Sequence, residues 1–138
     1  MNAVIRLAIL CLALFSLPSD GAEIRVKLSG DQEVPPVVTE ASGSGVLVVN
    51  ADRTITGAVT VRAMNVTVAH IHEGAADKVG PIIVLLQQTG PQTWSVPPGA
   101  KLTESQYESY KSGNLYFNVH TAAFRNGEVR GQIRPVTR

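Results

Sequence analysis

Three histidines are the residues of this chain best suited to bind a transition metal. Two of them, His70 and His72, are separated only by Ile71. In a β-strand, residues two positions apart point to the same face, so this pair is expected to project together. His120 lies in a second strand-like stretch, where apolar residues again alternate with polar ones. If the two strands are neighbours, three imidazoles converge, and this is the core of a transition-metal site.

The ligand types indicate which metal such a site would hold. Three neutral imidazoles without a thiolate favour copper, with zinc as the alternative. Three protein ligands leave one coordination position open, for water or for Glu73. Tyr116 and Asn118 share the His120 face by strand parity, and we expect them to orient the imidazoles by accepting the remote ring N–H. Arg130 is expected to face outward. It either attracts anions at the rim of the site or is an ordinary solvated strand residue.

The competing interpretation is that the three histidines are ordinary strand residues. The sequence alone does not establish that their two strands are adjacent. Other catalytic arrangements are disfavoured, and no catalytic residue is assigned. Ser42 and Ser44 lie in a glycine-rich stretch without a nearby histidine, which argues against a serine triad. The stretch 31–33 contains no partner that would make an acid–base pair.

Short strand-like stretches separated by turns run through most of the chain. The expected strands span residues 23–30, 46–50, 54–62, 67–72, 82–86, 115–121 and 128–134. Residues 41–45 are expected to be flexible, and the unbroken apolar run 82–86 to be covered on both faces. Residues 89–99 are rich in glycine and proline, and Trp94 is expected to pack over the end of the core.

One short helix is expected, beginning at Thr103. Gln106 lies three residues later, which is the spacing of a capping box, and Gly113 can end the helix. Asn126-Gly127 predicts a hairpin turn. The pattern as a whole predicts an all-β fold, an antiparallel Greek-key β-sandwich of seven to eight strands with one short helix.

The N-terminal segment has the features of a signal peptide. Arg6 precedes an apolar run over residues 7–15, and small residues follow. The run is shorter than the about 20 residues that a membrane span needs. We expect residues 1–22 to be removed and residues 23–138 to form one domain without a membrane span. The single cysteine, Cys11, is lost with that segment, which favours a periplasmic or secreted protein without disulfides.

The number and distribution of charged residues bear on whether the protein binds nucleic acid. The formal net charge is +1, and charged residues make up 17% of the chain without a basic run. Nucleic-acid binding needs a clustered basic patch, so a nucleic-acid partner is disfavoured.

Five motifs, in order, resemble the CHRD domain, a domain named from chordin and found in many bacterial secreted proteins. They are 28–36 (LSGDQEVPP), 69–74 (AHIHEG), 80–84 (GPIIV), 118–122 (NVHTA) and 127–133 (GEVRGQI). The resemblance covers residues 27–134 and implies a secreted β domain. It identifies no protein partner, because nothing in these motifs points to the growth factors that chordin binds.

A more distant resemblance concerns the histidine pair. The stretch 70–73 is similar to the His-Val-His-Glu strand of copper/zinc superoxide dismutases, which are also Greek-key sandwiches. In those enzymes a later strand histidine joins the pair at copper, the position that His120 would take in this chain. An arginine guides superoxide there, a role that Arg130 resembles. This chain has no histidines for the bridging or zinc positions, so a binuclear copper/zinc site is excluded.

Three functions remain open from the sequence. The favoured one is a periplasmic or secreted protein that holds one copper ion through His70, His72 and His120 and serves in copper handling. The second is a mononuclear copper redox enzyme resembling superoxide dismutase. The third is a metal-free protein-interaction module that uses a loop such as 34–41.

Overall fold

β-Strands are the main regular element of the described chain. The computed structural model describes residues 21–136, so Cys11 and all of the predicted signal peptide except Gly21 and Ala22 lie outside the described residues. The strands are β1 (Glu23–Ser29), β2 (Ser42–Val49), β3 (Ile55–Arg62), β4 (Val66–Glu73), β5 (Ile82–Leu85), β6 (Gln87–Gly90), β7 (Thr93–Ser95), β8 (Leu115–Thr121) and β9 (Val129–Ile133). The helices are the 3₁₀ turn η1 (Gly30–Gln32) and α1 (Glu104–Lys111).

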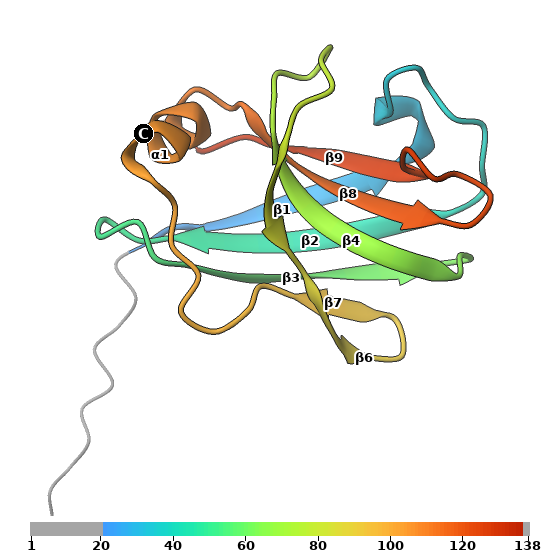
Figure 1. The fold of residues 1–138 in the computed structure, drawn as a ribbon, viewed down its shortest axis with the longest axis horizontal. Helices are drawn as coiled ribbons and strands as arrows, with labels where there is room; N and C mark the ends of the chain where they lie inside the picture. The colour runs from blue at the N-terminus through green and yellow to red at the C-terminus, as the bar shows by residue number, and fades with distance from the viewer. Residues whose placement is uncertain (1–20, 137–138) are drawn as a thin grey trace, which may run out of the picture.

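All of these strands belong to one antiparallel sheet that curls back on itself. Its order is β5-β4-β8-β9-β1-β2-β3-β7-β6. The two edge strands, β5 and β6, are separated in the chain by Leu86 alone, so the sheet is nearly closed. In Figure 1, β4 crosses in front of β2, and α1 lies at one end. The predicted antiparallel β-sandwich with one short helix is confirmed.

The glycine-rich stretch before the second predicted strand is part of that strand. Residues 41–45 were expected to be flexible, yet β2 already begins at Ser42 and pairs with both β1 and β3. A Cβ atom on Gly45 would lie 2.8 Å from Cε2 of Phe117. Glycine therefore lets β2 approach the aromatic ring closely, and the prediction of a flexible segment is wrong.

One further prediction fails at an edge of the sheet. The apolar run 82–86 was expected to be covered on both faces, but Ile82 is 54% exposed and Leu85 is 57% exposed. The reason is that β5 is an edge strand with β4 as its single strand neighbour. The glycine- and proline-rich stretch 89–99 contains the short strand β7, which pairs with β3 and β6, and Trp94 of this strand packs in the core.

Helix α1 begins and ends where the capping residues predict. The backbone N–H of Gln106 donates to Oγ1 of Thr103 at 3.1 Å, and the N–H of Thr103 donates to Oε1 of Gln106 at 2.9 Å. The two bonds form the predicted capping box. Gly113 follows the helix with φ +75°, a conformation that glycine adopts without strain.

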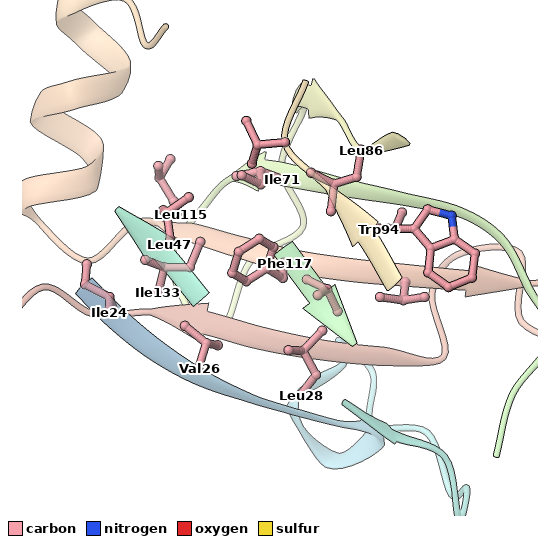
Figure 2. Packing of buried hydrophobic residues seen from close by; sticks show 14 of the residues in the cluster. Ile24, Val26, Leu28, Leu47, Ile71, Leu86, Trp94, Leu115, Phe117 and Ile133 are labelled. Carbon is pink, nitrogen blue, oxygen red and sulfur yellow. The ribbon is translucent and has the colours of Figure 1, made fainter. Parts of the chain in front are cut away.

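The apolar core lies between the layers of the curled sheet. In Figure 2, Phe117 lies between Val26 and Leu28 on one side and Ile71 and Leu86 on the other. Ile71 and Phe117 are fully buried and are direct partners in the β4–β8 register. This core uses the odd-numbered residues of β4 and β8, so their even-numbered residues must face the other way.

Candidate metal centre

The β4–β8 register brings the three histidines onto one patch of the sheet. His70 is paired with Asn118 and His72 with Tyr116, while His120 is paired with Val68. All of these residues lie on the face opposite the core, and His120 is the diagonal neighbour of His70. The adjacency that the sequence could not establish is therefore present.

The nitrogen atoms of the three imidazoles lie close enough to share one ion. One ligand atom from each of His70, His72 and His120 lies within 4.8 Å of the others. Nδ1 of His70 and Nε2 of His120 are 3.2 Å apart. Two nitrogens on a tetrahedral metal with bonds of about 2.0–2.1 Å are about 3.3 Å apart. The observed spacing of this pair matches that value, so the residues present fit a transition metal.

Two backbone carbonyls orient the imidazoles. Nδ1 of His72 lies 2.8 Å from the carbonyl oxygen of Gly80, and Nδ1 of His120 lies 2.8 Å from that of Arg125. A carbonyl oxygen can only accept, so each Nδ1 carries the proton, and in the neutral ring Nε2 keeps its lone pair. The orienting groups are thus main-chain carbonyls, and the expectation that Tyr116 and Asn118 accept these protons is wrong.

The same argument fixes the neutral tautomer of the third histidine. Because Nε2 of His120 holds a lone pair, Nδ1 of His70 must be the donor in the 3.2 Å contact between them. A metal ion would replace that proton and take both lone pairs. Nε2 of His72 is buried without a hydrogen-bond partner, and it is one of two such side-chain nitrogens in residues 21–136. A metal would also give this atom its partner.

Burial keeps the histidine pair in the neutral form that binds metal. Burial, and after it the neighbouring His120 and His72, lower the pKa of His70 to about 4. Burial also lowers the pKa of His72, against an opposing contribution from its bond to Gly80. Both imidazoles are therefore neutral at pH 7, as metal ligation requires.

The loop between β4 and β5, residues 74–81, lies over the histidine site, and Gly80 allows its close approach to β4. A Cβ atom at Gly80 would collide with the carbonyl oxygen of Glu73, so only glycine allows the loop to lie this close to β4. The N–H of Gly80 donates to the Tyr116 hydroxyl at 3.0 Å. The Tyr116 ring stacks on His72 with centroids 4.9 Å apart and planes 8° apart. Tyr116 and Gly80 thus hold His72 by stacking and by a hydrogen bond.

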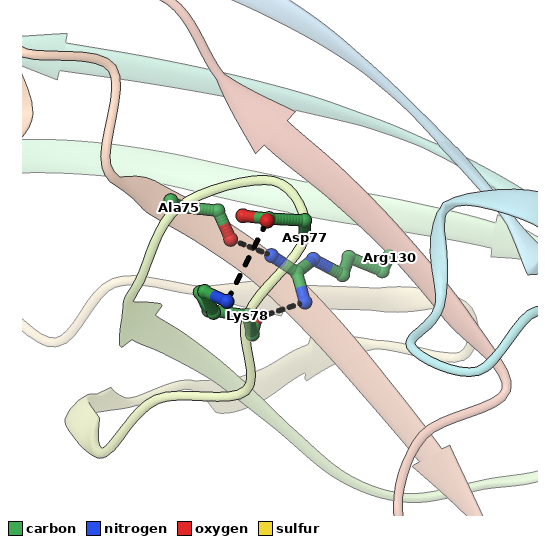
Figure 3. A network of polar contacts seen from close by, with 4 residues as sticks. All are labelled: Ala75, Asp77, Lys78 and Arg130. Atoms are coloured by element: carbon green, nitrogen blue, oxygen red, sulfur yellow. Dashed lines mark hydrogen bonds and ion pairs between the residues drawn. The ribbon is translucent and has the colours of Figure 1, made fainter.

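Arg130 lies on the face of β9 opposite the core, as predicted, but it is buried there and not exposed to solvent. It is 1% exposed, and its guanidinium lies 3.5 Å from the centroid of the Tyr116 ring. Its two terminal nitrogens donate to the carbonyls of Lys78 and Ala75 at 2.7 and 2.8 Å (Figure 3). The loop covers this face of β9, so Arg130 fastens the loop instead of standing in solvent.

Glu73 lies away from the histidines. Its register partner is Leu115, which places it on the core-facing side of β4. Its carboxylate accepts a hydrogen bond of 2.5 Å from Ser109 of α1. The structure therefore does not place Glu73 as the fourth ligand.

Glu33 is a residue of the site that strand parity did not reveal. It is buried, and Asn118 donates to its carboxylate. Burial raises the pKa of Glu33 to about 7, although the bond from Asn118 and the charge of Arg130 act in the opposite direction. Glu33 directly follows η1, outside any strand, so parity gave no signal. The available signal was its place within the 28–36 motif.

A cavity of ≈ 350 Å³ reaches two of the histidines. Its lining residues are Glu33, Val34, His72, Val79, Tyr116, Asn118, His120, Arg125, Asn126 and Arg130. A small molecule could reach a metal held by the histidines through this opening.

The comparisons with known proteins point to one family. A family model described as the CHRD domain matches residues 24–133. The searches of curated proteins and of solved structures found no match. Within residues 21–136, no helix is both long and apolar enough to cross a membrane.

Proposed function

The chain belongs to the CHRD domain family, and we propose that it is an exported protein that binds one copper ion for copper handling. The ligands are His70, His72 and His120. One observation carries the proposal: three buried imidazoles from two paired strands present nitrogen atoms within 4.8 Å of one another. An ordinary structural role leaves the buried Nε2 of His72 without a partner, whereas metal binding does not.

The ligand set supports copper over zinc. A site made of imidazole nitrogens binds divalent copper more tightly than zinc by the general order of stabilities. The cavity beside His72 and His120 leaves room for a further, non-protein ligand. Structural zinc sites have four protein ligands and no such opening. Zinc remains the alternative ion, and elemental analysis of protein purified from its native compartment decides between the two.

Copper titration of the purified protein against a chromophoric chelator tests the binding. We expect one equivalent to bind, and the His70→Ala/His72→Ala/His120→Ala variant to lose at least about 100-fold in affinity, because even outer partners of a metal site account for 10–100-fold. Gln88→Ala in β6 is the control, since Gln88 is exposed and its side chain donates to the carbonyl of Gly90. Equal affinity in the triple variant and the wild type would contradict the proposal.

Export is proposed from the N-terminal segment alone. The apolar run 7–15 after Arg6 supports a signal peptide ending near residue 22. N-terminal sequencing of protein recovered outside the cytoplasm should begin at about residue 23. A chain that retains residue 1 would contradict this part of the proposal.

The cavity favours a second candidate function, a mononuclear copper redox enzyme. Small molecules could reach the metal beside His72 and His120. The terminal nitrogens of Arg130, however, are committed to loop carbonyls, which weakens the comparison with the substrate-guiding arginine of superoxide dismutases. Stopped-flow dismutation by copper-loaded protein tests this function, and rates no higher than those of free copper would remove it.

A further inference from the structure

We propose that the cavity beside the histidines binds a small organic carboxylate, held between the metal and Arg130. The inference rests on the proposed metal site and adds to it a ligand class. Three observations support it: an unpartnered buried donor, an excess of positive charge, and an apolar part of the lining.

The first observation concerns buried nitrogens without partners. Within residues 21–136 there are two, Nε2 of His72 and Nε of Arg130, and both residues line the same cavity. A metal on the histidines gives Nε2 of His72 a partner, whereas Nε of Arg130 stays without one. The terminal nitrogens of Arg130 are already engaged by Lys78, Ala75 and Gln132. These bonds use three of the five N–H groups of the guanidinium, so the Nε–H and one N–H of Nη1 remain, and Nε is the guanidinium nitrogen without any hydrogen-bond partner.

The second observation is the charge balance of the lining. Arg130 and Arg125 are its two cationic side chains, and Glu33 is its single carboxylate. Glu33 already accepts from Asn118. Asp77 also acts on Arg130, but its carboxylate is exposed and lies 3.6 Å from Nζ of Lys78. Because the three imidazoles are neutral ligands, a bound metal ion adds positive charge that the protein does not balance, and this favours an anion.

The third observation is that the cavity has apolar walls as well as polar ones. Val34 and Val79 are its apolar lining residues. Its volume of ≈ 350 Å³ lies at the lower end of the range for small-molecule pockets. Arg130 and Glu33 also line a smaller cavity of ≈ 140 Å³. An anion with a short hydrocarbon part can contact both the polar and the apolar lining residues, whereas inorganic phosphate can bind only to the polar ones.

The test uses the copper(II)-loaded protein and follows its visible absorption band during titration with propionate. We expect a saturable shift at one site, with a weaker response to inorganic phosphate. Arg130→Lys should weaken propionate binding by about tenfold or more, because lysine has no Nε–H in that position. Arg130 also fastens the 74–81 loop, so copper affinity is measured in the same variant to detect a disturbed metal site.

A second variant leaves the buried residues intact. Val79 lines the cavity and is 73% exposed, so Val79→Glu places a negative charge at the rim without disturbing the core. We expect the apparent Kd for propionate to rise by about three- to tenfold through charge repulsion. The matched control is Val38→Glu, because Val38 is 100% exposed and does not line the cavity. It should leave the Kd within about twofold.

The outcomes separate this inference from the metal site itself. If one copper ion binds but propionate gives no saturable shift, the carboxylate site is overturned while the metal site stands. If Val79→Glu and Val38→Glu change the Kd equally, propionate binds outside the cavity and the inference is again overturned. If copper does not bind at all, both proposals fall together.

Discussion

The two faces of strands β4 and β8 are both buried, but they are built from opposite kinds of residue. The odd-numbered face carries Ile71, Phe117 and Val119, which are fully buried in the core. The even-numbered face carries His70, His72 and His120, also buried, beneath the loops that hold Gly80 and Arg125. Along each strand, core residues therefore alternate with polar residues that point to the opposite face.

The difference shows how a polar face can be buried in a small domain. An apolar face gains free energy simply by leaving water. A polar face must find a hydrogen-bond partner for each buried donor or acceptor, or lose stability. In this domain loop carbonyls supply partners for His72, His120 and Arg130, and two nitrogens remain unpartnered among the described residues. The core face stabilises the fold, and under the proposed function the histidine face holds the metal ion.

Substitutions on opposite faces of the two strands should separate stability from metal binding. Phe117→Ala removes a fully buried ring from the core and should lower the free energy of unfolding by about 3–5 kcal/mol. At temperatures where this variant is folded, its copper affinity should stay within about tenfold of the wild type. Losses of about 10–100-fold in metal affinity are typical for residues that hydrogen-bond the ligands, and Phe117 does not do so.

His72→Ala should do the reverse. It removes a ligand and should lower copper affinity by at least about 100-fold, with a smaller loss of metal-free stability than Phe117→Ala. Chemical denaturation and chelator competition on both variants measure the two quantities. If Phe117→Ala reduced copper affinity as much as His72→Ala does, the proposed division between the faces would be wrong.

The second prediction uses opposing pH dependences on the polar face of the metal-free protein. The pKa of Glu33 is raised from 4.5 to about 7, so the folded state binds the proton more tightly and its stability falls as pH rises through that window. The pKa of His70 is lowered from 6.5 to about 4, so its contribution to stability rises with pH through its own window. Between about pH 4.5 and 6.5 the two effects oppose each other, and the net dependence should be shallow.

Glu33→Gln removes one of these two effects. Stability of this variant should rise with pH between about 4 and 6.5, because the histidine contribution remains. At about pH 4 the free energy of unfolding of the variant should be close to that of the wild type. Above about pH 7 it should exceed the wild-type value by up to about 3 kcal/mol. Urea unfolding across this range measures the gain. Glu40→Gln, the same change at an exposed carboxylate, is the control. An equal, pH-independent effect of both substitutions would contradict the prediction.

The sequence predicted what depends on strand parity and missed what depends on loops. Alternation placed His70 and His72 on one face, and the pattern around His120 predicted a matching strand. The same alternation placed Arg130 on the correct face of β9 but could not show that a loop covers it. Parity likewise gave no signal for Glu33, because the residue lies outside the strands.

The orienting groups of the histidines could not be predicted from residue types. Gly80 and Arg125 act through their carbonyl oxygens, which every residue possesses, so only the path of the chain reveals them. The sequence shows a glycine at position 80, but the reason for it is the close approach to Glu73. Tyr116 and Asn118 are the candidates that a sequence suggests, because the chemistry of a side chain is visible in its residue type.

The smallest predicted effect tests whether the covering loop contributes to the metal site. Tyr116→Phe keeps the ring that stacks on His72 but removes the hydroxyl that accepts from Gly80. Loss of this bond should lower the free energy of unfolding by about 1 kcal/mol. It should also weaken copper binding by about tenfold, because the loop no longer holds the carbonyl that orients His72. Tyr107→Phe makes the same change on α1 and should leave copper affinity unchanged. Unchanged affinity in Tyr116→Phe would mean that the loop covers His72 without orienting it, and the histidine face would then depend on the strands alone.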